Sequence, residues 1–179
     1  MNEKSAALLE SFRKQNGYSL NIFDDMSASP IPIRVYNQAQ SLVFRDAILS
    51  GPEINLVQLA VSVENSCEFC VPAHTASAIR THASDPKVVD EIRDSRKVFD
   101  LKIDALVNLA RSMVHNRGKI PPEVTAEFYA QGYTKEHLFE VLTIVAYKTI
   151  TNYTSAIMNT KPNPEHAEYR WKRSDEVTK

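Results

Sequence analysis

Prolines divide this chain of 179 residues into segments that have the character of helices. Eight of the nine prolines lie between segments in which apolar residues recur at helical spacing, and only Pro72 falls inside such a segment. Glycine, with 4 residues, is scarce. The pattern predicts an all-α protein whose helices are joined by proline-containing connections.

The run from Leu56 to Val63 is the most ambiguous segment, because a short apolar run also suits a buried strand. It is predicted to be a helix, since the apolar residues continue for longer than a typical strand and no hairpin turn follows. Asn65 and Ser66 then resemble a cap. We therefore expect Ser66 to start a second helix that runs to about Ala83.

Two further apolar faces are predicted from helical spacing. The first consists of Val35, Ala39, Leu42, Val43 and Ile48. The second belongs to the longest helix, from Lys135 to about Met158, and consists of Leu138, Val141, Leu142, Val145 and Tyr153. The apolar stripe of this helix also suits a subunit interface. The charged tail from Lys161 is expected to fray.

Composition is that of an ordinary globular domain, with 43% hydrophobic and 24% charged residues. We expect one domain over residues 1–179, with the first ~30 residues and the tail after 161 peripheral. A net charge of -1 offers no basic field for nucleic acid. No apolar run reaches the ~20 residues of a membrane span, and the first residues lack the apolar core of a secretory signal, so a cytoplasmic location is predicted.

Both cysteines of the chain lie in one short segment, at Cys67 and Cys70, and His74 follows four residues later. On a helix these three side chains share one face, because residues three and four apart are neighbours. Unpaired N–H groups at a helix start favour a thiolate, and the imidazole can move a proton one turn away. The segment predicts dithiol redox chemistry that needs no metal or organic cofactor.

The cysteine pair also fits three alternative roles. A zinc site would have Cys67, Cys70 and His74 as three ligands and would need a fourth from another histidine or a carboxylate. The thiols could also be inert and buried. A third alternative is a redox-switched helical assembly module, in which disulfide closure shifts helix packing.

The residues Leu59-Ala60-Val61-Ser62-Val63-Glu64-Asn65-Ser66-Cys67-Glu68-Phe69-Cys70, followed by His74, resemble the signature of alkylhydroperoxidase D-like proteins of the carboxymuconolactone decarboxylase family. The layout of the remaining helices is similar to that of peroxidase-related members. The resemblance implies a single-domain antiparallel helical bundle of the alkylhydroperoxidase D-like type that assembles into homo-oligomers.

The resemblance also implies roles for the three site residues. Cys70 becomes the sulfenic acid, Cys67 is the proton donor and resolving thiol, and His74 belongs to the proton relay. The implied enzyme is a hydroperoxide-reducing, peroxiredoxin-type peroxidase that is recycled by an external dithiol or a thiol adapter protein. The alternatives are a dithiol-disulfide oxidoreductase that does not act on peroxides and, with less support, a carboxymuconolactone-type decarboxylase, whose branch does not depend on a cysteine pair.

Two positions depart from the pattern of the peroxidatic members. Asn55 stands where they have a glutamate, twelve residues before the first cysteine, and Phe69 stands where they have a histidine. Glu53 and Glu64 are near in sequence, and Glu64 is three residues from Cys67. We therefore name Glu64 as a possible relay carboxylate and Asn55 as a residue that could orient a sulfur or a water.

Overall fold

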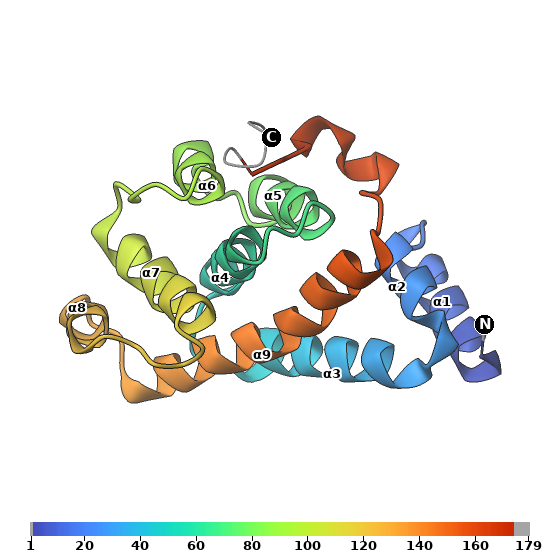
Figure 1. Ribbon diagram of the computed structural model, residues 1–179, viewed down its shortest axis with the longest axis horizontal. Helices are drawn as coiled ribbons and strands as arrows, with labels where there is room; N and C mark the ends of the chain where they lie inside the picture. Colours follow the sequence, from blue (N-terminus) through green and yellow to red (C-terminus); the bar gives the residue numbers. More distant parts are fainter. Residues whose placement is uncertain (1, 174–179) are drawn as a thin grey trace.

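The structure is a computed structural model that describes residues 2–173, and over those residues it consists of helices without a strand (Figure 1). The all-α prediction is confirmed. In chain order the elements are α1 (Glu3–Asn16), α2 (Asn21–Asp25), η1 (Met26–Ala28), α3 (Pro30–Asp46), α4 (Gly51–Glu64), α5 (Cys70–Arg80), α6 (Pro86–Arg93), α7 (Leu101–His115), α8 (Pro122–Ala130), α9 (Lys135–Met158) and η2 (Pro164–Tyr169).

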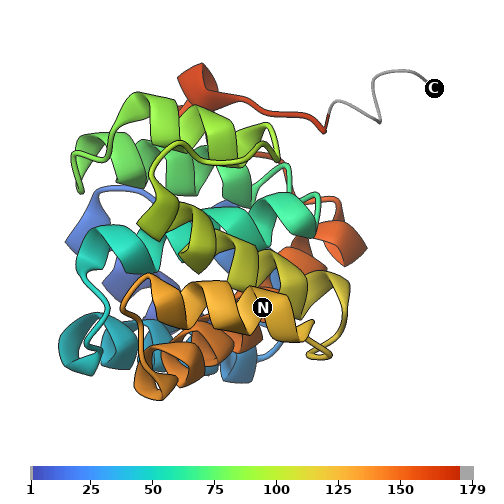
Figure 2. The ribbon, with the colours of Figure 1, turned by 90° about the vertical axis from the view of Figure 1, so that its left-hand side faces the viewer.

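Helix α4 is the central helix of the protein. It begins with a capping box in which Ser50 and Glu53 satisfy each other's backbone N–H groups. Every residue from Ile54 to Val63 is buried, because α5, α6, α7 and α9 all contact α4 (Figures 1 and 2). A helix that is apolar all round needs such complete cover. The ambiguous run is therefore a helix, as predicted.

The core consists of two clusters of buried side chains on opposite sides of α4. The larger joins α4 to α2, α3, α7 and α9 and includes Phe23, Ile54, Leu106 and Ile144. The smaller joins α4 to α5, α6 and α7 around Ile92. None of the helices over residues 2–173 has the length and apolar character that a membrane crossing needs.

The helix that follows α4 starts later than the sequence predicts. Ser66 does not cap it: this residue has a φ of 50°, in the left-handed region, and reverses the chain after α4. Cys67 lies in the resulting turn, and α5 begins only at Cys70 and ends at Arg80. The two cysteines are thus a turn residue and the first residue of a helix, not two residues on one helical face.

The predicted buried faces of α3 and α9 are partly wrong. Val43 and Val141 are buried, but Val35, Leu42 and Ile48 are exposed, as are Leu142 and Tyr153. Helix α9 lies against both α3 and α4, and the buried residues on it are Val141, Ile144, Tyr147, Lys148, Thr151, Asn152 and Ser155. Apolar residues occur on more than one side of α9, so helical spacing alone gave the wrong phase.

The tail does not fray after residue 161, at least as far as residue 173. It passes beside α5 as η2, and the Asn163 side chain bonds both to the N–H of Asn21 and to the carbonyl of Ser19. Trp171 donates its indole N–H to the carbonyl of Arg93 at 3.0 Å. These contacts satisfy buried polar groups, which the charge pattern of the tail could not reveal.

Candidate active site

A cavity of about 430 Å³ lies between the N-terminal helices, α4, α5 and α9. Its inner part is polar and buried, with Asn55, Gln58, Cys70, His74, Lys148 and Thr151. The rest of its wall is largely aromatic, with Phe12, Tyr18, Phe23, Tyr36, Phe44 and Phe69. The cavity reaches the surface beside the exposed residues Phe44, Arg80 and Thr81. Apolar walls around a few polar groups are typical of a small-molecule site.

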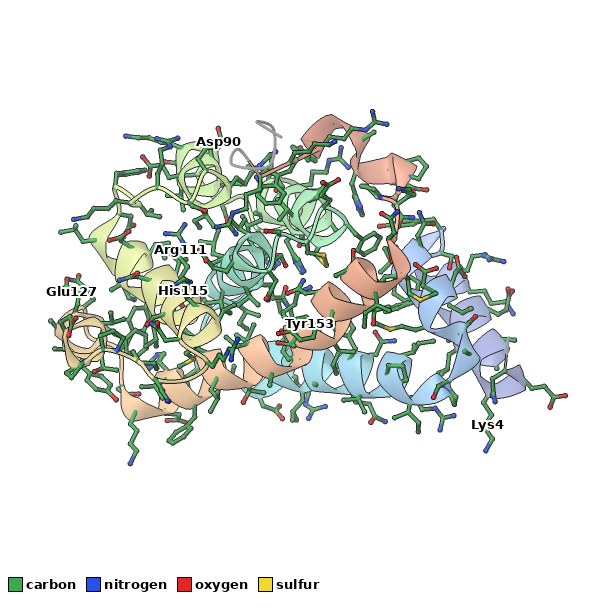
Figure 3. All side chains as sticks on the ribbon, viewed as in Figure 1. Lys4, Asp90, Arg111, His115, Glu127 and Tyr153 are labelled. Atoms are coloured by element: carbon green, nitrogen blue, oxygen red, sulfur yellow. A yellow bond between two sulfur atoms is a disulfide. The ribbon has the colours of Figure 1, made fainter. Side chains whose placement is uncertain are left out.

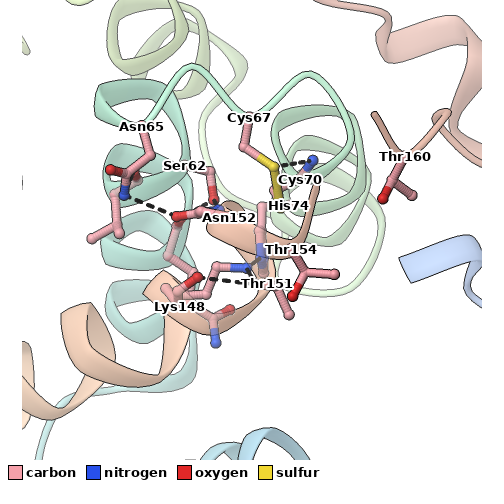
Figure 4. Close-up of a disulfide and its surroundings, with 12 residues drawn as sticks. Ser62, Asn65, Cys67, Cys70, His74, Lys148, Thr151, Asn152, Thr154 and Thr160 are labelled. Atoms are coloured by element: carbon pink, nitrogen blue, oxygen red, sulfur yellow. Dashed lines mark hydrogen bonds between the residues drawn. A yellow bond between two sulfur atoms is a disulfide. The ribbon is translucent and has the colours of Figure 1, made fainter. Parts of the chain in front are cut away.

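Cys67 and Cys70 form a disulfide at the inner end of this cavity (Figure 4). The Sγ of Cys67 also accepts the backbone N–H of Cys70 at 3.2 Å. Both residues are buried, but only Cys70 lines the cavity. Cys70 is also the first residue of α5, where the N-terminal end of the helix favours a thiolate. The two sulfurs are thus differently placed toward a substrate.

Asn55 determines the protonation of His74. The Asn55 amide donates from Nδ2 to the backbone carbonyl of His74 at 3.0 Å, so its Oδ1 is left to accept. That Oδ1 lies 3.3 Å from Nδ1 of His74. Nδ1 of His74 therefore carries the proton, and Nε2 has the free lone pair. The predicted orienting role of Asn55 is directed at the imidazole and not at a sulfur.

Lys148 meets the free lone pair of His74. Its Nζ lies 2.7 Å from Nε2 of His74 and donates to Oγ1 of Thr151 at 3.1 Å (Figure 4). It also lies 5.5 Å from the ring centre of Tyr36. Within residues 2–173, Lys148 forms no ion pair with a carboxylate. Burial lowers the pKa of Lys148 to about 7.

Burial, and then the charge of Lys148, hold the pKa of the His74 imidazole well below its ordinary value. His74 is therefore neutral at pH 7. Two tyrosines complete the polar end of the cavity region: Tyr147 accepts from the Gln58 amide at 2.6 Å, and Tyr36 packs edge-on against Tyr147. Burial raises the pKa of both hydroxyls, so they too are neutral. Lys148 is the cation of this inner end.

Glu64 and Glu53 lie elsewhere. The Glu64 carboxylate faces Arg111 of α7, 3.8 Å from its Nε, and lines a separate cavity. Arg111 and His115 of α7, which are labelled in Figure 3, line the same cavity. Glu53 accepts from Tyr133 and closes the cap of α4. Neither carboxylate lines the cavity beside Cys70. The structure thus brings Cys67, Cys70, His74 and Asn55 together and leaves Glu64 out.

The first ~30 residues and the tail are not peripheral to this cavity. Phe12, Tyr18 and Phe23 line it from the N-terminal side, and His166 lines it from η2. The hydroxyl of Tyr18 lies 3.4 Å from Nε2 of His166, which joins the two segments. Both segments therefore contribute to the wall of the cavity.

Lys148 is the site residue that sequence reasoning missed. Its signal is a charge on the otherwise apolar or neutral buried stripe of α9, three and four residues from Thr151 and Ile144. A fully buried lysine is rare unless it is paired or functional. The sequence prediction also did not include Gln58, a polar residue inside the apolar run of α4.

Residues 34–99 match the model of the carboxymuconolactone decarboxylase family. This range contains both cysteines, His74 and Asn55. No curated relative matches the chain.

Solved structures share the fold at low sequence identity. An uncharacterized peroxidase-related protein from Ralstonia eutropha JMP134, described as an alkylhydroperoxidase AhpD core, is 20% identical with a TM-score of 0.80, over 93% of this chain and 88% of that one. An uncharacterized peroxidase-related protein from Silicibacter sp. TM1040 is 16% identical with a TM-score of 0.75, over 92% and 87%.

A debrominase, Bmp8, in complex with 2,3,4-tribromopyrrole is also similar, at 16% identity and a TM-score of 0.72, over 99% of this chain and 95% of that one. These likenesses establish the arrangement of helices. Residues 34–99, which contain the Cys-x-x-Cys segment, are similar to the carboxymuconolactone decarboxylase family, and the chain shares its fold with peroxidase-related proteins of the alkylhydroperoxidase AhpD type.

Proposed function

We propose that this protein is a dithiol-dependent peroxidase that reduces hydroperoxides through Cys70 and Cys67. The observation that carries the proposal is the disulfide at the inner end of a cavity that Cys70 lines and Cys67 does not. A thiol that faces the cavity can meet a substrate, and a second thiol within disulfide distance behind it can resolve the product.

The reaction balances without a cofactor. The Cys70 thiolate attacks the terminal oxygen of the hydroperoxide; an S–O bond forms, the O–O bond breaks, and the leaving oxygen takes a proton to give an alcohol. The Cys67 thiol then attacks the sulfenic acid, the S–S bond forms, and water leaves. An external dithiol, free or on an adapter protein, reduces the disulfide by two successive thiol–disulfide exchanges. The net change is hydroperoxide plus dithiol to alcohol, water and the dithiol's disulfide.

The test uses the reduced protein with cumene hydroperoxide and dithiothreitol. We expect turnover in the wild type and none in Cys70→Ser. Cys67→Ser should consume one equivalent of hydroperoxide and stop at a sulfenic acid, detected by mass spectrometry after dimedone trapping. If Cys67→Ser is inert and Cys70→Ser is oxidised, the roles of the two sulfurs are reversed. If wild type and Cys70→Ser react equally slowly, the peroxidase proposal is wrong.

A second candidate is reductive removal of a halogen from a small aromatic ring, favoured by the aromatic side chains in the wall of the cavity. The carbon–halogen bond breaks, halide leaves, the carbon gains a proton, and the two thiols become a disulfide. The reduced protein would be incubated with 2,3,4-tribromopyrrole, the ligand of the similar debrominase. Bromide released in equal amount to disulfide supports this candidate, and disulfide formation by hydroperoxide alone argues against it.

The proposal includes a homo-oligomer. Exposed apolar residues on α3 and α9, which lie side by side in Figure 1, support it: Ile31, Val35, Leu42, Phe139 and Leu142. Sedimentation velocity measures the mass directly. A monomer at all concentrations would rule the oligomer out.

A further inference from the structure

Lys148 is a buried cation to which the two sulfur steps described above assign no role. Only 1% of its surface is exposed, and it lines the same cavity as Cys70. A buried ammonium without a counter-ion costs much more free energy than an apolar side chain of similar shape. In the part of the chain that the structure describes, no carboxylate forms an ion pair with it. A functional role would explain why this costly buried charge is present.

The hydrogen bonds of Lys148 have a defined direction. Asn55 places the proton of His74 on Nδ1, so Nε2 of His74 must accept from Lys148. Oγ1 of Thr151 accepts a second Lys148 N–H, because that hydroxyl donates its own proton to the carbonyl of Lys148. An ammonium has three N–H groups. The third has no hydrogen-bond acceptor within residues 2–173, and Nζ lies 5.5 Å from the ring centre of Tyr36, which lines the same cavity.

We propose that Lys148 is the general acid of this site, and that its Nζ gives a proton to the oxygen that leaves when Cys70 attacks a hydroperoxide. This inference rests on the proposed peroxidase function. The S–O bond forms, the O–O bond breaks, and the electron pair of that bond stays on the leaving oxygen, which takes the proton from Nζ to become an alcohol. Lys148 is left as a neutral amine and regains a proton from solvent through the cavity before the next turnover.

The groups around Lys148 make it the proton carrier. His74 of α5 is neutral at pH 7 because its pKa is well below the ordinary value, and Tyr36 of α3 and Tyr147 of α9 are neutral because their pKa values are raised. Asn55 and Gln58 of α4 do not titrate. His166 of η2 also lines the cavity, and burial lowers the pKa of its imidazole from the ordinary value. Among the groups in contact with Lys148, it is Lys148 itself whose pKa, about 7, lies near neutral pH.

This assignment predicts a specific pH profile. The rate of Cys70 oxidation should rise as the thiol ionises and fall again as Lys148 loses its proton, with the descending limb near pH 7. A group that only held the fold together would not produce that limb. Rapid-quench mass spectrometry of the reduced protein with cumene hydroperoxide, from pH 5 to pH 10, measures the profile.

Iodoacetamide is the matched probe for Cys70, because its leaving group is iodide and needs no proton. In Lys148→Met we expect the limiting rate with cumene hydroperoxide to fall roughly 100-fold, the usual contribution of a general acid. The limiting rate with iodoacetamide, at a pH where the thiol is fully ionised, should change less than about threefold. Lys135→Met, at an exposed position of the same helix, should change neither rate.

Lys148→Arg separates charge from proton transfer, since a guanidinium keeps its proton at every pH in this range. The descending limb should vanish while the rate with hydroperoxide stays well below that of the wild type. A limb that persists near pH 7 in this variant, or an equal loss of both rates in Lys148→Met, overturns the assignment of Lys148 alone.

A wild type that does not react with hydroperoxide overturns the peroxidase function itself, so the two failures are distinguishable. Circular dichroism checks the fold of each variant. If Lys148→Met does not fold, the wild-type profile decides, because a rate that shows no descending limb between pH 6 and pH 9 contradicts the proposal.

Discussion

The two sides of α4 each hold a largely buried cation, and the two cations differ in one respect. On the α7 side, Arg111 faces the Glu64 carboxylate and also donates to the carbonyls of Arg96 and Ile92. On the α9 side, Lys148 faces a neutral imidazole, a hydroxyl and a ring. Both lie beside a cavity. Among the lining residues that the structure describes, the cavity with the carboxylate has no cysteine, and the cavity with the cysteine has no carboxylate.

This difference separates a structural cation from a titrating one. Burial lowers the pKa of Arg111, but Glu64 and Asp104 oppose that effect, and a guanidinium keeps its proton at neutral pH in any case. Within residues 2–173 no carboxylate pairs with Lys148 to oppose the effect of burial, so its pKa falls to about 7. The absence of a carboxylate partner is what makes a proton at Lys148 available to chemistry.

The largest effect that tests this comparison is expected in the pH dependence of the free energy of unfolding. Lys148 has a pKa of about 7 in the folded protein against an ordinary value of 10.5, so the unfolded chain binds more protons between these two pH values. The free energy of unfolding therefore rises with pH across this window and gains no further contribution from Lys148 below pH 7. In Lys148→Met this rise should disappear.

At pH 7, Lys148→Met should also be more stable than the wild type, by about 2 to 4 kcal/mol. Removal of the buried charge stabilises the folded protein by roughly 5 kcal/mol. The Nε2 of His74 then lacks its hydrogen bond, which destabilises the folded protein by roughly 1 to 3 kcal/mol. Arg111→Met should instead destabilise by about 1 to 3 kcal/mol, because it leaves Glu64 without its cation. Urea unfolding at several pH values measures both, and the same sign for the two variants would contradict the comparison.

A carboxylate placed beside Lys148 should make the α9 side resemble the α7 side. In Thr151→Asp the new carboxylate lies next to Nζ and favours the ammonium, so the pKa of Lys148 rises. The descending limb of the hydroperoxide profile should move upward by about one pH unit. Thr143→Asp, on an exposed turn of α9, serves as the control and should leave the limb in place. An unmoved limb in Thr151→Asp means that the limb has another origin.

The smallest effect is expected for Glu64→Gln. Glu64 lines the cavity on the α7 side, away from Cys70, so the rate with cumene hydroperoxide should stay within about twofold of the wild type. The same variant weakens the pairing of Arg111 and is expected to lower stability slightly. A tenfold loss of rate without a loss of stability would show that Glu64 takes part in proton transfer. The two sides of α4 would then not differ in function as proposed.

Part of this site could be predicted from local pattern. Cys67, Cys70 and His74 lie within eight residues, and no arrangement of the chain can separate them by much. The pattern was nevertheless wrong about how they meet. Cys67 lies in a turn that Ser66 opens with a positive φ, and a left-handed serine has no clear sequence signature.

The partners of His74 could not be predicted in the same way. Asn55 is 19 residues from His74, and Lys148 is 74 residues from it. Glu64 was attractive because it is close to Cys67 in sequence, yet a helix turns about 100° per residue, and α4 directs Glu64 toward α7. Nearness along the chain therefore failed as a guide to nearness in the site.

The sequence by itself determined that this protein is helical, that the run from Leu56 to Val63 is a helix and not a strand, and that two thiols and an imidazole lie close together. Helical period, capping and proline placement depend on residues a few positions apart, so they can be recognised in the sequence. Only the tertiary structure decided which cation reaches His74, which sulfur faces the cavity and which carboxylate is turned away. These contacts depend on how α4, α5 and α9 pack, and packing is set by side chains far apart in sequence.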